Sequence, residues 1–235
     1  FHKAKEFEKA ENLYNEVISE NPDHFETYYY LGNLKIALKD FQKAENYFRK
    51  AINYKPDFFQ AYMNLGNTLK ELSKFSEAEQ IYKKTIDLNP NYTKAYYNLG
   101  ALQQDQNRFE EAEKNLKVVI KIDPNFFQAY LNLGTILKNF KKFEEAEQIL
   151  RKAINLDSNN ARAHNNLATI LVDLVRLDEA EELIQKAIKL NPNLSESYKN
   201  LDLVLKKKEL KKIIERNKSL HTNKQGLSLN PFISK

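Results

Sequence analysis

Apolar and small residues recur along this chain with a single long period. Gly32, Gly66, Gly100 and Gly134 are each 34 residues apart, and Ala168 and Asp202 hold the next two places in register. Alanines and large apolar residues follow the same period at Ala10, Ala44, Ala78, Ala112, Ala146 and Ala180, and at Phe7, Phe41, Phe75, Phe109, Phe143 and Leu177. Prolines do so at Pro22, Pro56, Pro90, Pro124 and Pro192, with Ser158 in the gap. Such a period predicts stacked repeats in place of a globular domain.

Each period contains two stretches of helical spacing. In the second complete repeat these stretches predict one helix over 60–72 and another over 76–88, and Asn89-Pro90-Asn91 ends the unit. The pattern divides the chain into a partial repeat with only its second helix (1–24), five complete repeats (25–58, 59–92, 93–126, 127–160 and 161–194), a capping helix (195–217) and a tail or linker (218–235).

The periodic residues have the sizes that a helix pair requires. Gly66 and Ala78 are small, as expected where two helices cross, and Tyr62, Leu65 and Tyr82 are large enough to fill the space between helices. Each large side chain contributes roughly 1.5–3 kcal/mol when fully buried. Since one repeat cannot bury this face alone, neighbouring repeats are required for stability.

These motifs resemble the tetratricopeptide repeat (TPR) family. The matching pattern is Tyr62-x2-Leu65-Gly66, then Ala78-x3-Tyr82, then Pro90, and the resemblance covers residues 1 to about 205. The tryptophan usual in this family is Tyr or His here, at Tyr28, Tyr62, Tyr96, Tyr130, His164 and Tyr198. The resemblance implies an all-α fold, a right-handed superhelix (α-solenoid) of stacked antiparallel helix pairs.

Both ends of the chain depart from the pattern. The first repeat lacks most of its first helix, and we interpret the sequence as a fragment of a longer protein; a natural start with a lone capping helix is the alternative. From Ser195 the columns decay, and Ile214 falls in the alanine column. Residues 218–235 contain the breakers Gly226 and Asn230-Pro231 among apolar residues, as expected of a linker or of a tail packed on the last helices.

Charge and composition limit the classes of partner that we expect for this chain. The net charge is +5, but residues 195–235 hold 10 Lys and Arg against 4 Asp and Glu, so the repeats themselves are near neutral. The basic stretch Lys206–Lys212 is not interleaved with aromatic residues, which favours a solvated capping face over contact with nucleic acid. The chain has no cysteine, and it shows no signal peptide and no apolar run long enough to span a membrane. These features favour a cytoplasmic location.

No pattern indicates catalysis, a cofactor or a metal. The histidines His2, His24, His164 and His221 are not paired at metal-ligand spacing, and His164 occupies a packing column. Acidic pairs such as Glu110-Glu111 and Glu144-Glu145 begin second helices, where negative charge suits the helix dipole. There is no phosphate-binding loop and no Ser–His–Asp signature. We therefore expect this chain not to be an enzyme.

The candidate binding residues form a column two places before each glycine: Asn64, Asn98, Asn132, Asn166 and Asn200. In the TPR family these positions face the concave groove, and the column resembles the asparagine ladder in the repeat arm of O-linked N-acetylglucosamine transferase, which holds peptide backbone. An asparagine side chain has both a donor and an acceptor for that purpose. Further expected groove residues are Asn33, Asn67, Lys94, Tyr97, Gln128 and Arg162, together with Gln60, Met63, Leu131, Thr135 and Thr169. Tyr30 interrupts the column at its start.

A second TPR binding mode, the carboxylate clamp for acidic chaperone tails, fits less well. Its pattern maps onto Tyr29, Asn33, Asn64, Lys94 and Asn98. Tyr29 and Asn98 stand where the clamp requires cations, so two of its three cations are missing and a clamp is not expected.

The sequence therefore predicts a non-catalytic protein-interaction scaffold that binds an extended peptide through the asparagine column. The alternative is a substrate-recruiting arm of a larger enzyme, such as a glycosyltransferase, whose catalytic domain lies outside these residues. A third hypothesis is end-to-end self-association through the N-terminal face. No nucleic-acid partner, membrane span, cofactor or metal is expected.

Overall fold

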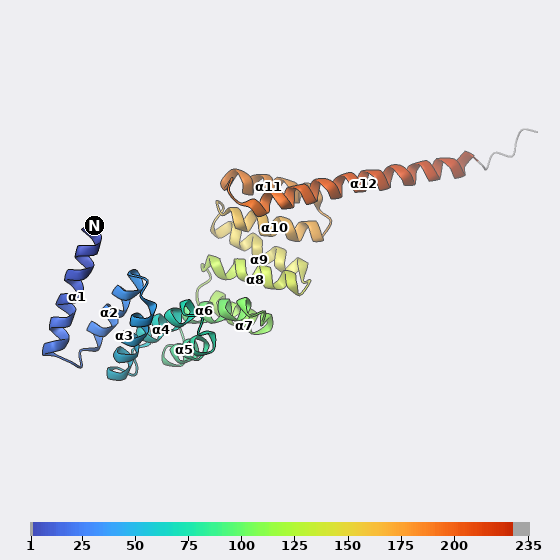
Figure 1. Ribbon diagram of the computed structural model, residues 1–235. Helices are drawn as coiled ribbons and strands as arrows, with labels where there is room; N and C mark the ends of the chain where they lie inside the picture. The colour runs from blue at the N-terminus through green and yellow to red at the C-terminus, as the bar shows by residue number, and fades with distance from the viewer. Residues whose placement is uncertain (1, 228–235) are drawn as a thin grey trace, which may run out of the picture. The chain divides into compact units, whose positions relative to one another are not determined.

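The computed structural model describes the backbone of residues 2–227 and the side chains of residues 6–218. Helices make up the secondary structure of this part, and it contains no strand. The helices are α1 (His2–Glu20), α2 (Phe25–Ala37), α3 (Phe41–Tyr54), α4 (Phe59–Glu71), α5 (Phe75–Leu88), α6 (Thr93–Asp105), α7 (Phe109–Ile122), α8 (Phe127–Asn139), α9 (Phe143–Leu156), α10 (Ala161–Asp173), α11 (Leu177–Leu190) and α12 (Ser195–Leu227) (Figure 1). The described residues fold into two compact units, which meet in the sequence at Ala129 and Tyr130. The expected all-α solenoid of paired helices is confirmed.

In the first unit, consecutive helices pack as antiparallel pairs. α2 packs on α3, α4 on α5 and α6 on α7, and each pair also contacts the next. The helices expected over 60–72 and 76–88 are α4 and α5, each starting one residue earlier. Asp40 caps α3 by accepting a hydrogen bond from the backbone N–H of Lys43, which satisfies one of the donors that a helix start leaves open.

The glycine column marks the place where a large side chain of the second helix lies against the first helix. A Cβ atom added at Gly66 would lie 2.6 Å from a ring carbon of Tyr82, and one at Gly32 would lie 2.5 Å from the ring of Phe48. Both distances are far below van der Waals contact. The absence of a side chain at these glycines therefore sets how closely the paired helices approach.

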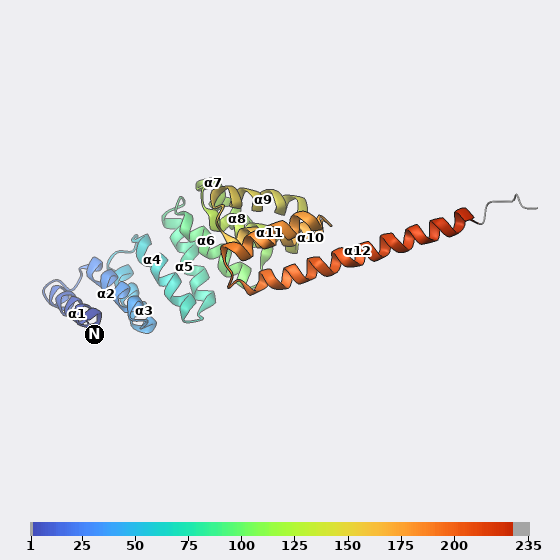
Figure 2. The same ribbon diagram turned by 90° about the horizontal axis from the view of Figure 1, so that it is seen from above.

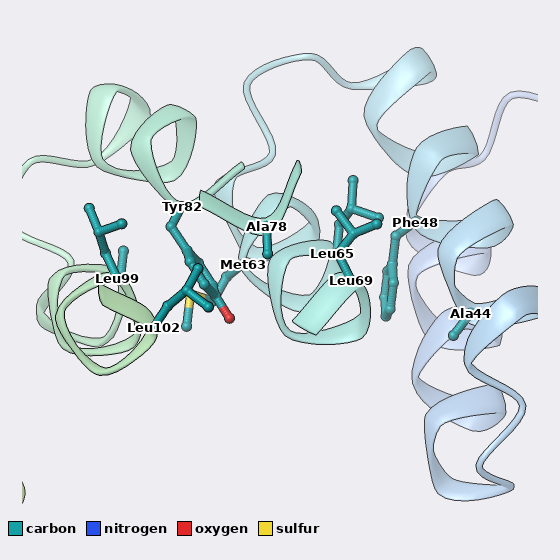
Figure 3. Close-up of a cluster of buried hydrophobic side chains, with 10 residues drawn as sticks. Ala44, Phe48, Met63, Leu65, Leu69, Ala78, Tyr82, Leu99 and Leu102 are labelled. Atoms are coloured by element: carbon teal, nitrogen blue, oxygen red, sulfur yellow. The ribbon is translucent and has the colours of Figure 1, made fainter. Parts of the chain in front are cut away.

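The core of the first unit is continuous from one repeat to the next. One buried cluster includes Phe48 of α3, Leu65 of α4, Tyr82 of α5 and Leu102 of α6. Figure 3 shows the Phe48 ring beside Leu65 and Leu69, and the Tyr82 ring near Met63 and Leu102. Since neighbouring repeats share these contacts, each repeat depends on the next for its stability.

The turn between the two helices of each repeat uses a left-handed residue. Lys39, Ser73, Asn107, Lys141 and Val175 have φ angles of 60°, 58°, 60°, 58° and 61°. These five positions are again 34 residues apart. None is glycine, and Val175 is β-branched, the side-chain type for which this conformation is most strained.

The second unit ends in a long single helix. α12 packs on α11 and α10 through its first half, where Val204 and Ser197 are fully buried, and then continues past both helices (Figures 1 and 2). The sequence predicted its end at 217, but the helix reaches Leu227. The segment 206–225 lacks Pro and Gly, and Lys218 stands in the column that is Phe48 or Tyr82 in earlier repeats. The chain therefore meets no helix breaker at which it could turn back, and it continues as one helix. Residues 228–235 of the predicted tail lie outside the described part.

Candidate functional site

Asparagines of three successive first helices line one hollow in the first unit. Asn33 of α2, Asn64 and Asn67 of α4, and Asn98 of α6 surround an open space of about 700 Å³. The Asn64 amide donates a hydrogen bond of 2.7 Å to the side-chain oxygen of Asn33. Asn98 donates an equivalent bond of 2.7 Å to Asn67. The asparagines therefore link neighbouring first helices directly.

Tyr82 adds a second contact to this network. Its hydroxyl, from the fully buried ring on α5, donates to the Asn67 oxygen at 2.9 Å. Since that oxygen also accepts from Asn98, both of its acceptor positions are filled. The orientation of the Asn67 amide is thereby fixed, and its N–H₂ group makes no hydrogen bond with the described residues.

A related hollow of about 410 Å³ lies in the second unit. Asn166 of α10 and Asn200 of α12 line it with Thr135 of α8 and Thr169 of α10. Asn200 donates to the side-chain oxygen of Asn165 at 2.9 Å, and the hydroxyl of Ser197 donates to the same oxygen at 3.1 Å. This hollow also contains Lys138, Lys199 and Glu196.

The remaining predicted site residues lie outside the two hollows. Lys94, Gln128 and Arg162 are exposed near the starts of α6, α8 and α10, and Asn132 is half-buried on α8. Tyr97 is half-buried, with its ring 4.9 Å from that of Phe126. Met63, which the sequence placed beside the groove, is only 4% exposed and belongs to the core cluster, because its side chain turns toward Tyr82 and Leu102.

A ladder of ion pairs was missed in the sequence. Glu45 of α3 accepts from Lys74, the N-cap residue of α5, at 2.8 Å, and Glu79 of α5 accepts from Arg108, the N-cap residue of α7, at 2.5 Å. In the second unit Glu147 of α9 pairs with Arg176 at 2.8 Å. The signal was available, because the acids share one 34-residue column (Glu45, Glu79, Glu113, Glu147, Glu181) and the cations share another (Lys74, Arg108, Lys142, Arg176).

The ladder keeps its carboxylates ionised. Hydrogen bonds from Arg108 and Lys83 outweigh the effect of burial and lower the pKa of Glu79 to about 2. Burial of Glu45 opposes ionisation, but the bonds from Lys74 and Arg49 hold its pKa below the usual range. These groups link second helices of neighbouring repeats, and their ionised, paired state is typical of a structural role.

His164 has the packing role that its column indicates. It is 1% exposed, and its Nε2 atom lies 2.9 Å from the backbone oxygen of Ser158. Tyr28 makes the same contact to Pro22, also six residues earlier, at 2.9 Å. Burial lowers the pKa of His164, so the neutral ring is favoured.

The described residues contain no group of three or more His, Asp and Glu side chains that could hold a metal ion. Within the same part of the chain, no helix combines the length and apolar character that a membrane crossing requires.

Several solved structures have a similar fold. YrrB, described as a TPR protein with an unusual peptide-binding site, has a TM-score of 0.68 and 20% identity over 79% of this chain and 95% of YrrB. PilF from Pseudomonas aeruginosa has a TM-score of 0.70 and 20% identity over 88% and 92%. MamA from Desulfovibrio magneticus RS-1 has a TM-score of 0.67 and 20% identity over 72% and 96%. At these identities the likeness shows the fold alone.

Sequence comparison gives the family. No curated protein sequence is significantly similar to the chain. A family profile, described as the Cilia and flagella-associated protein 70 C-terminal domain, matches residues 2–201 and so covers the paired helices and the start of α12. Together with the repeat columns and the helix pairs, this match shows that the chain belongs to the TPR family of the Cilia and flagella-associated protein 70 C-terminal domain.

Proposed function

We propose that the chain is a non-catalytic protein-interaction scaffold in which each unit binds an extended peptide segment at its asparagine-lined hollow. The observation that carries the proposal is the network of Asn33, Asn64, Asn67 and Asn98 on three successive first helices. Each side chain uses only part of its hydrogen-bonding capacity within the protein. The description of YrrB, which shares the fold, as having a peptide-binding site supports the same use of this chain.

The remaining groups suit a peptide backbone. Asn33 and Asn67 act as acceptors within the network and keep their N–H₂ groups for a ligand, whereas Asn64 and Asn98 act as donors and keep their oxygens. An extended peptide offers one N–H and one C=O per residue, so donors and acceptors on neighbouring helices can be matched. Binding through the backbone requires little of the peptide's side chains.

The expected affinity is modest. Each hydrogen bond contributes about 0.5–1.5 kcal/mol net, and ordering the peptide opposes binding. A few such bonds correspond to a dissociation constant of about micromolar to millimolar.

The proposal is tested with twelve-residue peptides selected by phage display against the full chain and then synthesised with a fluorescent label. The double variant Asn64→Ala/Asn98→Ala should lose most binding of first-unit peptides in fluorescence polarisation. Asn46→Ala/Asn53→Ala, on exposed positions of α3, is the matched control and should bind normally. Methylating the peptide's backbone nitrogens should also weaken binding, because it removes the N–H donors.

Two results would contradict the proposal. In one, the folded double variant binds as tightly as the wild type, so the partner uses another surface. In the other, the double variant unfolds at room temperature, so the asparagines serve only to hold α2, α4 and α6 together.

A further inference from the structure

Another open space in the second unit is lined largely by apolar side chains. It lies between α12 and the turn that joins α10 to α11, and its volume is about 350 Å³. Its apolar lining consists of Val172, Val175, Leu177, Leu210 and Ile214. None of these residues lines an asparagine hollow. We call this space the α12 notch.

Val175 is unusual at the edge of the notch. The other residues in its column are Lys39, Ser73, Asn107 and Lys141, all polar, as expected for an exposed turn. Val175 is β-branched, has φ 61°, and is 65% exposed. A residue of this type in the left-handed region costs stability, and little burial offsets that cost here. Such a residue at the rim of an apolar hollow points to a function outside folding.

The extension of α12 supplies the facing wall. Leu210 and Ile214, one turn apart on the helix, are 57% and 45% exposed. In the described part of the chain, α12 is the last helix and no later helix covers them. The notch therefore presents apolar side chains from two elements to solvent.

Positive charge lies along the α12 side of this apolar surface. On α12, Lys206 pairs with Asp202, and Lys208 pairs with Asp178 and Glu181. Lys207, Lys211 and Lys212 make no ion pair with the described residues, and the first two line the notch. Glu215 is the acidic residue in its lining. The rim is therefore basic overall.

We propose that the α12 notch binds an acidic peptide segment of a partner protein and takes one or two large apolar side chains of that segment. The apolar side chains would contact Val175, Leu210 and Ile214, and carboxylates beside them would pair with Lys207, Lys211 and Lys212. This site is separate from the asparagine hollows and goes beyond the function proposed for them.

An anionic membrane offers similar chemistry but fits the shape less well. A basic amphipathic helix binds a bilayer with a broad apolar face that lies flat on the surface. Here the apolar residues line a concave space next to a turn, and Asp202, Glu209 and Glu215 lie on the same helix. A hollow of this size accommodates side chains of a peptide.

The test uses a phage-displayed library of random twelve-residue peptides, selected on the full chain and counter-selected on Val175→Asn/Ile214→Asn. Peptides that survive should contain Asp or Glu next to Leu, Ile or Phe. In fluorescence polarisation they should bind Val175→Asn about tenfold more weakly than the wild type. Because Asn107 adopts the same turn conformation, Val175→Asn should not unfold the chain.

Control variants distinguish binding at the α12 notch from non-specific binding to exposed apolar residues. Leu13→Asn replaces an apolar residue of α1 with similar exposure, 61%, and should leave binding unchanged. Lys207→Gln/Lys211→Gln/Lys212→Gln should weaken binding and flatten its salt dependence. The proposal is overturned if no peptide is enriched, if enriched peptides lack acidic residues, or if they bind Val175→Asn as tightly as the wild type. Sedimentation with phosphatidylserine vesicles without peptide binding would also overturn it and assign the surface to lipid.

Discussion

The glycine column shows how a single missing methyl group sets the distance between two paired helices. At Gly66 a Cβ atom would lie 2.6 Å from the Tyr82 ring, whereas at Gly100 its nearest neighbours, among them Leu116, would be 3.4 Å away. In the fifth repeat Ala168 stands at this position, and its methyl group is fully buried. The column therefore combines sites that exclude a side chain with sites that tolerate one.

We predict that Gly66→Ala destabilises the chain and that Gly100→Ala does not. Overpacking costs about 1–3 kcal/mol, whereas replacing a helical glycine by alanine otherwise gains about 0.5–1 kcal/mol. The clash should dominate at Gly66 and the helical gain at Gly100. Urea unfolding of both variants measures the difference, and equal stabilities would show that the ring contact does not set the helix spacing.

A second residue-scale prediction concerns the strained turn. Val175→Gly should stabilise the second unit by up to about 1 kcal/mol, because glycine adopts positive φ without a steric penalty. Asn107→Gly, at the same place in the first unit, should gain less, because asparagine tolerates this conformation. A thermal melt in which Val175→Gly unfolds earlier than the wild type would mean that the valine contributes more by packing than it costs in the turn.

At the scale of the helix, the ion-pair ladder makes the packing of second helices sensitive to acid. The pKa of Glu79 is about 2 in the folded chain, below its ordinary value of 4.5. A carboxyl with a depressed folded pKa contributes stability above its unfolded pKa and loses that contribution as the pH falls toward the folded value. The contribution of Glu79 is therefore complete above about pH 4.5 and disappears between there and about pH 2.

We therefore predict that Arg108→Gln is less stable than the wild type at pH 7 and that the difference shrinks as the pH falls to about 2. The variant removes the main partner of Glu79, so its stability should depend less on this carboxyl. Lys84→Gln, at an exposed position of α5, is the control and should follow the wild type. A difference that stays constant from pH 7 to pH 2 would mean that the pair is not an electrostatic contact.

The helices could be predicted from the sequence because particular residue types mark them and recur with the 34-residue period. Glycine, alanine and aromatic columns placed α4 and α5 to within one residue at their starts. The left-handed turn could not be predicted in this way, since Lys39, Ser73 and Val175 share no chemistry. Their conformation is imposed by the two helices that they join.

The sequence indicated some of the residues that line the hollows, but it did not indicate the hydrogen bonds between them. The column indicated Asn64 and Asn98, and both line a hollow in the first unit. Their bonds to Asn33 and Asn67 join residues 31 apart, a separation that the 34-residue pattern does not display. The sequence also did not indicate the end of α12 or the α12 notch. Both depend on the part of α12 that has no partner helix, and the repeat pattern shows only where helices pair.

For the molecule as a whole, the ion pairs that join different helices have a mechanical consequence. In the ladder the carboxylate belongs to one repeat and its cation to the next, and Arg49–Glu77 and Arg151–Glu179 also join neighbouring repeats, while the glycine–ring contacts lie within single repeats. When the two ends are pulled apart, the contacts between successive repeats bear the force one after another along the chain. Each repeat that yields releases 34 residues, or roughly 100–120 Å of extended chain. Optical tweezers should therefore record lengthening in steps of about that size at low force.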